Sequence, residues 1–119
     1  MNTKNKEIRE MVDAVTELMQ DKKLKDIVIL DVQKLTSLTD YFILGTSEST
    51  PQTKAVTNHI YKHMREKGWR PNNLEDSKTL EWVAMDYFNI VIHIFNEETR
   101  SYYQFERLWG DAKIEKINE

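Results

Sequence analysis

Two histidines are the first candidates for a functional site in this sequence. His59 and His63 are four residues apart, the spacing at which two imidazoles on one face of a helix can share a metal ion. The residues between them lack the Glu that follows the first His in zinc metalloproteases. The third histidine, His93, falls in a predicted strand. We therefore expect partly buried structural histidines, with no metal site and no cofactor.

The segment Gly45–Ser47 lies between a predicted strand and a predicted helix, where a phosphate-binding loop or the Gly-Ser element of a nucleotidyltransferase would lie. Nucleotidyl transfer also needs a pair of carboxylates, usually two residues apart, to hold two divalent ions. No two acidic residues of this chain are separated by a single residue, and there is no cysteine nucleophile. The sequence thus predicts no catalytic residues and a protein that is not an enzyme. An enzyme using non-adjacent carboxylates, such as Asp31, Asp40 and Asp86, remains an alternative.

Three segments have the pattern of helices. Apolar residues between 8 and 19 recur at helical spacing. Thr50 is the expected N-cap of the second helix, and Gly68 is expected to end it in a left-handed conformation. Asn96 is expected to cap the last helix and Gly110 to end it.

Five segments have the composition of strands. They are Ile27–Val32, Tyr41–Thr46, a ragged stretch within 69–75, Leu80–Asp86 and Ile90–Phe95. The order α-β-β-α-β-β-β-α predicts an α/β fold in which three helices pack on a mixed sheet of about five strands. We expect residues 1–119 to form a single domain, with 111–119 as a charged, frayed tail.

Composition narrows the class of partner. The chain is 39% hydrophobic and 31% charged, with a net charge of −3, and it lacks both cysteine and an apolar run long enough to span a membrane. We expect a cytoplasmic protein. The densest basic stretch contains Lys62, Arg65, Lys67 and Arg70 but is broken by Glu66, and we interpret it as a solvated helix end. The charge balance favours a basic protein partner over strong direct nucleic-acid binding.

The segment Leu80–Asp86 is the strongest candidate for a binding surface. Alternation puts Trp82 and Asp86 on one face of this strand, and Met85 and Tyr87 on the other. Large amphipathic aromatic residues at the end of a strand are typical anchors of protein interfaces. The predicted partner surface comprises Glu75, Trp82, Met85, Asp86 and Tyr87.

From residue 82 to residue 112 the chain carries a distinctive series of motifs. In order they are W-x-x-x-D-Y, H-x-F, R-x-x-Y and E-x-L-W-x-D-A. This series resembles the ribosomal silencing factor (Iojap-like) family, and weaker agreement extends over most of residues 6–112. The residues that carry the resemblance are Trp82, Asp86, Tyr87, His93, Phe95, Arg100, Tyr103, Glu106, Leu108, Trp109, Asp111 and Ala112.

The resemblance implies a nucleotidyltransferase-like fold that has lost its catalytic carboxylates. It also implies binding to the large ribosomal subunit through ribosomal protein L-fourteen, a steric block to joining with the small subunit, and repression of translation when nutrients are scarce. A small RNA-binding protein is a further alternative. Because the predicted strands carry more apolar surface than three helices can cover, we also expect a homodimer in the free state.

Five residues depart from the family's pattern. Ser47, Gln52 and Asp76 stand where the family often has Gly, His and Gly, respectively. Phe88 and Asn89 replace a common Gly-Asp in the turn after the strand. Asn89 tolerates the left-handed conformation that such a turn needs. Phe88 adds an apolar side chain at the edge of the predicted partner surface.

Overall fold

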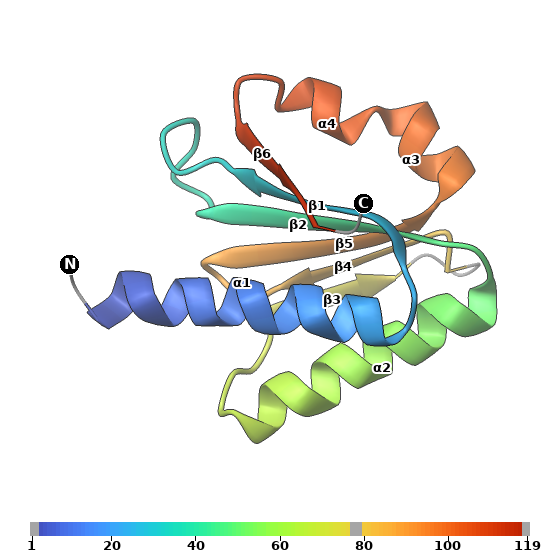
Figure 1. Cartoon of the computed structure of the whole chain (residues 1–119), viewed down its shortest axis with the longest axis horizontal. Helices are drawn as coiled ribbons and strands as arrows, with labels where there is room; N and C mark the ends of the chain where they lie inside the picture. Colours follow the sequence, from blue (N-terminus) through green and yellow to red (C-terminus); the bar gives the residue numbers. More distant parts are fainter. Residues whose placement is uncertain (1–2, 77–79, 118–119) are drawn as a thin grey trace.

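Helical segments enclose a mixed six-stranded sheet in the computed structural model, which describes residues 3–76 and 80–117 (Figure 1). The helices are α1 (Thr3–Asp21), α2 (Thr50–Glu66), α3 (Glu97–Tyr103) and α4 (Phe105–Leu108). The strands are β1 (Lys25–Asp31), β2 (Tyr41–Ser47), β3 (Asn73–Asp76), β4 (Trp82–Asp86), β5 (Ile90–Asn96) and β6 (Lys113–Lys116). The α/β class and the mixed sheet predicted from the sequence are confirmed, with one strand more than expected.

The order of strands across the sheet is β3-β4-β5-β2-β1-β6. The central pair, β2 and β5, is parallel, and the other neighbours are antiparallel. Ser47 of β2 lies beside Asn96 of β5, so the carboxyl ends of the two parallel strands meet at one edge. Ligands in open α/β sheets commonly bind at such an edge, so it is a candidate binding site.

One side of the sheet is covered by α1 and α2 (Figure 1). The apolar periodicity of the first helix is confirmed, because Val12, Val15 and Met19 are fully buried. The prediction that Thr50 caps α2 was wrong. The cap is Ser49, which has an extended backbone and a hydroxyl that accepts a hydrogen bond from the Gln52 amide at 3.1 Å.

The other side is covered by α3 and α4, which the sequence analysis treated as one helix. Asn96 caps α3 as expected, and its side chain accepts a hydrogen bond from the Thr99 amide at 2.8 Å. The helix is interrupted at Gln104, whose φ and ψ are both 49°. This left-handed residue redirects the chain, so that Phe105 is buried and Leu108 remains 75% exposed.

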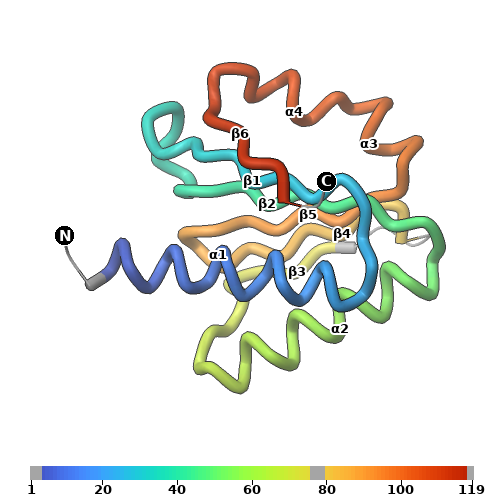
Figure 2. The backbone as a smooth tube through the Cα atoms, in the orientation of Figure 1, coloured from blue at the N-terminus to red at the C-terminus, as the bar shows by residue number. Residues whose placement is uncertain are grey.

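The predicted frayed tail contains the strand β6. It pairs antiparallel with β1, from Val28 opposite Lys116 to Asp31 opposite Lys113. Figure 2 shows this C-terminal segment lying beside β1, which is far from it in the sequence. All four residues of β6 are exposed, so the strand has no alternating apolar pattern to reveal it. Its charged side chains suit an edge strand that must not pair with other molecules.

Candidate partner-binding surface

One face of β4 is only partly covered by the rest of the chain. Trp82, Ala84 and Asp86 are partly exposed along it. Glu75 of β3 pairs opposite Ala84, and Val91 of β5 pairs opposite Asp86. Residues opposite each other in antiparallel strands share a face. We call the surface formed by these five residues the open face of the sheet.

The other face of β4 belongs to the core. Met85 is fully buried and Tyr87 is 3% exposed, under the layer formed by α1 and α2. The five residues predicted to form one partner surface therefore separate: Glu75, Trp82 and Asp86 lie on the open face, whereas Met85 and Tyr87 support it from beneath. Alternation along the strand required this separation. Burial raises the pKa of Tyr87 to about 12, and its hydroxyl has no hydrogen-bond partner among the described residues.

Trp82 is fixed by a buried histidine of the neighbouring strand. The Trp82 indole Nε1 donates a hydrogen bond to Nδ1 of His93 at 2.9 Å. His93 is 7% exposed, and its burial lowers its pKa to about 4. The imidazole is therefore neutral near pH 7, with its proton on Nε2, because an indole can only donate. This bond holds the indole at a defined place on the open face.

Two tyrosines of α3 extend the aromatic surface beyond Trp82. The rings of Trp82 and Tyr103 are 4.9 Å apart, and those of Tyr103 and Tyr102 are 5.0 Å apart. Tyr103 is 55% exposed and Tyr102 is 80% exposed. Neither tyrosine was predicted to lie on the partner surface, because their distance from β4 depends on how α3 returns over the sheet. Exposed aromatic side chains next to a fixed tryptophan are suited to anchor a protein partner.

The turn after β4 closes one end of the open face. An oxygen of the Asp86 side chain accepts a hydrogen bond from the Phe88 amide at 2.8 Å. Phe88, and not Asn89 as expected, adopts the left-handed conformation, with φ of 71°. Glycine reaches this conformation at no steric cost, which suits the Gly that the family resemblance leads us to expect at this position. The Phe88 side chain is 61% exposed. The side-chain Nδ2 of Asn89 donates a hydrogen bond to the Asp40 carboxylate at 3.0 Å.

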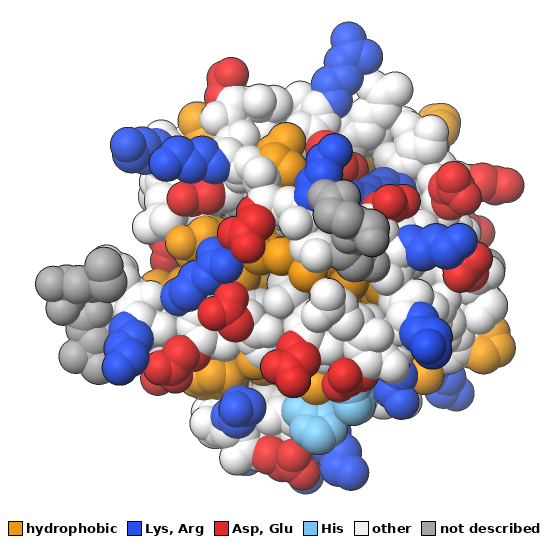
Figure 3. Space-filling view, viewed as in Figure 1, with side chains coloured by type: hydrophobic (Ala, Val, Ile, Leu, Met, Phe, Trp, Pro, Cys, Tyr) orange, Lys and Arg blue, Asp and Glu red, His pale blue; other side chains and the backbone are white. Residues whose placement is uncertain are grey.

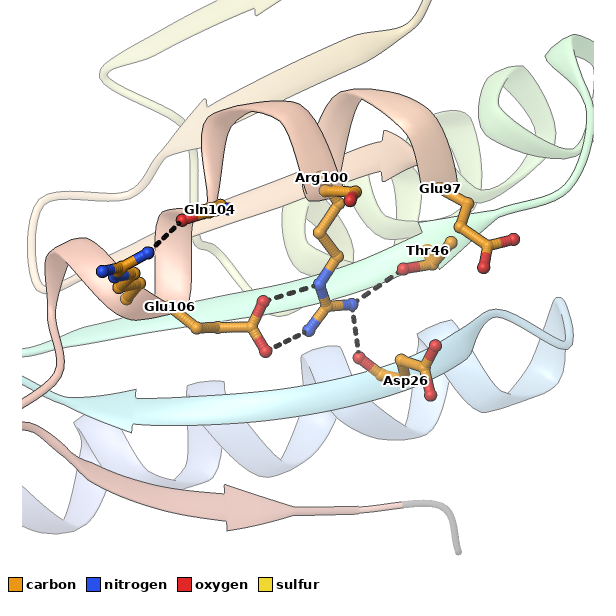
Figure 4. A pocket seen from close by; sticks show the side chains of 8 residues that line it. Asp26, Thr46, Glu97, Arg100, Gln104 and Glu106 are labelled. Carbon is orange, nitrogen blue, oxygen red and sulfur yellow. Dashed lines mark hydrogen bonds and ion pairs between the residues drawn. The ribbon is translucent and has the colours of Figure 1, made fainter.

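A pocket of about 500 Å³ lies near the carboxyl ends of the parallel strands (Figure 4). Arg100 of α3 crosses it and is only 8% exposed. Its guanidinium donates to both carboxylate oxygens of Glu106, at 2.8 and 2.9 Å. It also donates to the Asp26 carbonyl at 2.6 Å and to Oγ1 of Thr46 at 2.8 Å. Arg100 thus ties α3 and α4 to the ends of β1 and β2.

The same edge does not have the character of a phosphate site. The Arg100 charge is taken up by Glu106, and Asp26 and Glu97 add negative charge to the lining. Gly45 has a packing role, because a Cβ there would lie 2.8 Å from Cδ1 of Leu24. These contacts favour the structural interpretation of the Gly45–Ser47 segment.

The histidine pair is a surface feature (Figure 3). The two rings are 4.5 Å apart and partly buried, as expected. His59 contacts Asp21 at 3.1 Å, and His63 contacts Glu66 at 3.4 Å. Within residues 3–76 and 80–117, no three His, Asp or Glu side chains are grouped as metal ligands. The same part of the chain contains no helix with the length and apolar character needed to cross a bilayer.

A sequence model described as "Ribosomal silencing factor during starvation" matches residues 5–119. The chain belongs to the ribosomal silencing factor family. It is 37% identical over 107 residues to the ribosomal silencing factor of Chromobacterium violaceum, covering 90% of this chain and 88% of that protein. It is 33% identical over 98 residues to the ribosomal silencing factor of Bacillus subtilis, covering 82% and 83%. A crystal structure of a Chromobacterium violaceum protein has a TM-score of 0.83 at 35% identity, covering 94% of this chain and 93% of the other.

Several residues that mark the silencing factor pattern have structural roles here. Trp82 and His93 form the hydrogen bond described above, and buried Arg100 forms an ion pair with partly exposed Glu106. Tyr87 lies in the core. In this chain the motif therefore includes residues that support the fold, and it does not by itself separate contact residues from supporting ones.

The departures from the family pattern also have local explanations. The Gln52 side chain donates to the carbonyls of Lys22 and Lys23 at 2.9 and 3.1 Å, which ties the start of α2 to the end of α1. The Ser47 hydroxyl accepts a hydrogen bond from Thr53 at 2.7 Å. The side chain of Asp76 lies outside the described part of the structure.

Proposed function

We propose that this chain binds the large ribosomal subunit and represses translation by occupying the surface on which the small subunit joins. The observation that carries the proposal is the family match over residues 5–119, together with the name shared by its relatives. The family resemblance indicates ribosomal protein L-fourteen, on the intersubunit face, as the direct partner. The chain acts in the cytoplasm by occupying space, without turnover.

The open face and Tyr103 are the proposed contact with that partner. Trp82 is the central anchor, because a fixed, partly exposed indole can bury apolar area on binding with little loss of side-chain entropy. Glu75 and Asp86 place carboxylates around it, which suits a basic protein. Met85 and Tyr87 take part by holding β4 in place.

Substitution of the anchor tests this surface. Truncating an aromatic residue at the centre of an interface costs about 2 kcal/mol or more, so Trp82→Ala should weaken subunit binding at least roughly thirtyfold. Lys22→Ala and Lys116→Ala should leave binding almost unchanged. Because Trp82 also bonds to buried His93, a second variant, Tyr103→Ala, removes an exposed ring without breaking a buried bond. If both aromatic variants stay folded and bind like the unaltered protein, the open face is the wrong surface.

Sedimentation tests the proposed state of the ribosome. On a sucrose gradient the protein should migrate with free large subunits and be absent from joined ribosomes. Steric exclusion gives this distribution because the small subunit and the protein compete for one surface. Migration with joined ribosomes would contradict occlusion.

We also propose that the free protein pairs with a second copy. The open face and the exposed rings of Tyr102 and Tyr103 leave apolar surface that a monomer would expose to water. If the copies pair through this surface, dimer formation and subunit binding compete. Light scattering over a range of concentrations tests the state directly, and a monomeric mass at the highest concentration would rule the dimer out.

A further inference from the structure

The solvent-facing side of α2 differs in charge from the rest of the molecule. Residues 50–74 contain five cations, Lys54, Lys62, Arg65, Lys67 and Arg70, and one acid, Glu66. This segment has a net charge of +4 in a chain of net charge −3, so the remaining residues carry −7. The positive charge is concentrated on one element and its exit.

The cations of α2 lie along one exposed stripe of the helix. Thr53, Val56, Ile60 and Met64 face the sheet. At 3.6 residues per turn, the opposite side presents residues at successive spacings of three and four. The basic stripe consists of Lys54, Asn58, Tyr61, Lys62 and Arg65, all exposed. It is about 16 Å long, since its ends are eleven residues apart and each residue rises about 1.5 Å.

Among the described residues, the cations of this stripe have no acidic partners. Lys54, Lys62 and Arg65 form no ion pair with any acidic side chain in the described part of the chain. Glu66, the acid of this segment, contacts His63 at the flank of the stripe. By contrast, α1 mixes both signs, and its Arg9 pairs with Asp13 at 3.1 Å. A helix face that only needs solvation has no reason to exclude acids.

A linear row of cations interleaved with an amide and a phenol matches a nucleic-acid backbone. Lys and Arg meet phosphates, and Asn and Tyr side chains donate hydrogen bonds to phosphate and sugar oxygens. The stripe and the open face lie on opposite sides of the sheet, because α2 covers the side away from α3 (Figure 1). Six residues join α2 to β3, the edge strand that carries Glu75, so a partner that contacts both surfaces must extend around this edge.

We propose that the basic stripe of α2 contacts the RNA backbone of the large ribosomal subunit while the open face contacts protein. This inference rests on the proposed function, and it revises the interpretation of the basic stretch as a solvated helix end. The RNA contact adds affinity and orientation to a complex anchored by protein, which agrees with the expectation, from the charge balance, that the chain does not bind nucleic acid strongly by itself.

The salt dependence of binding tests this contact. Log affinity falls linearly with log salt, and each lost phosphate contact makes this line less steep by roughly 0.7 to 0.9. The slope for the triple variant Lys54→Gln, Lys62→Gln, Arg65→Gln should therefore be less negative by about two to three units. Between about 50 and 200 mM salt, the unaltered protein should lose roughly 20- to 40-fold more affinity for large subunits than this variant does. A matched control, Lys4→Gln, Lys6→Gln, Lys22→Gln, removes three exposed or partly exposed cations of α1 and its end.

The same titrations on protein-free RNA from the large subunit separate this inference from the proposed function. A less steep salt dependence for the α2 variant, both on large subunits and on protein-free RNA, supports the RNA contact if the α1 control is unchanged. Equal slopes for the unaltered protein and the α2 variant would overturn it, and so would an equal effect of the α1 control. If the α2 variant has a less steep salt dependence than the unaltered protein on large subunits but not on RNA, the stripe contacts an acidic protein instead, and the RNA contact is overturned. If RNA shows the difference but subunits are not bound at all, the proposed function fails and the RNA contact stands.

Discussion

Acidification should destabilise this protein through His93, the buried partner of Trp82. The folded-state pKa of His93 is lowered to about 4 by burial, whereas an unperturbed histidine has a pKa of 6.5. Between these two values the unfolded chain binds more protons than the folded one, so the free energy of unfolding falls as pH is lowered. One pKa unit corresponds to about 1.4 kcal/mol, and the loss from about pH 7 to about pH 4 is therefore about 3 kcal/mol. The stabilising effect of neutral His93 is fully present only above about pH 6.5.

Urea unfolding at a series of pH values measures this effect. Carboxylates also titrate in this range, so the quantity of interest is the difference between the unaltered protein and His93→Gln. Glutamine does not titrate but keeps an oxygen that can accept the Trp82 hydrogen bond. The free-energy curve of His93→Gln should be flatter by about 3 kcal/mol between pH 7 and pH 4. Parallel curves for the two proteins would refute the burial argument.

Three further substitutions test the packing that supports the open face. Tyr87→Phe should raise the free energy of unfolding by about 1 kcal/mol, because it removes a buried hydroxyl that lacks a partner among the described residues; lower stability in urea would contradict this. Arg100→Lys should lower the free energy of unfolding by about 3 kcal/mol, because an ammonium cannot replace the two parallel hydrogen bonds to the Glu106 carboxylate. The control Arg107→Lys, at an exposed arginine, should change the free energy of unfolding by under about 0.5 kcal/mol. Gly45→Ala should cost about 1–3 kcal/mol through overpacking against Leu24, measured as a shift in the urea midpoint, and an unchanged midpoint would show that Leu24 moves freely.

The parts of the fold that the sequence predicted are those with a strong apolar pattern. The apolar residues of α1 and the β-branched runs of β1 and β5 bury large side chains, so the amino-acid pattern of these elements reflects their place in the core. The elements that sequence reasoning missed have no such pattern. All residues of β6 are exposed, and its place in the sheet depends on the free edge of β1. The break at Gln104 depends on a backbone conformation that no residue type there announces.

The candidate surface was predicted in part, for a reason specific to strands. Alternation correctly separated Trp82 and Asp86 from Met85 and Tyr87, but it does not say which face the helices cover. The family pattern could not decide either, because it includes both partly exposed Trp82 and buried Tyr87. The contribution of Tyr103 depends on α3 folding back over the sheet, a contact between distant segments.

Subunit joining in vitro is the most direct test of occlusion by this chain. Purified large subunits are incubated with an excess of the protein, small subunits are then added, and light scattering follows the formation of joined ribosomes. The proposed function predicts that the scattering increase is suppressed in proportion to the amount of bound protein, and that Trp82→Ala, if folded, suppresses it only at concentrations roughly thirtyfold higher. An unchanged amplitude and rate of joining, with the protein shown to occupy the large subunits, would contradict occlusion.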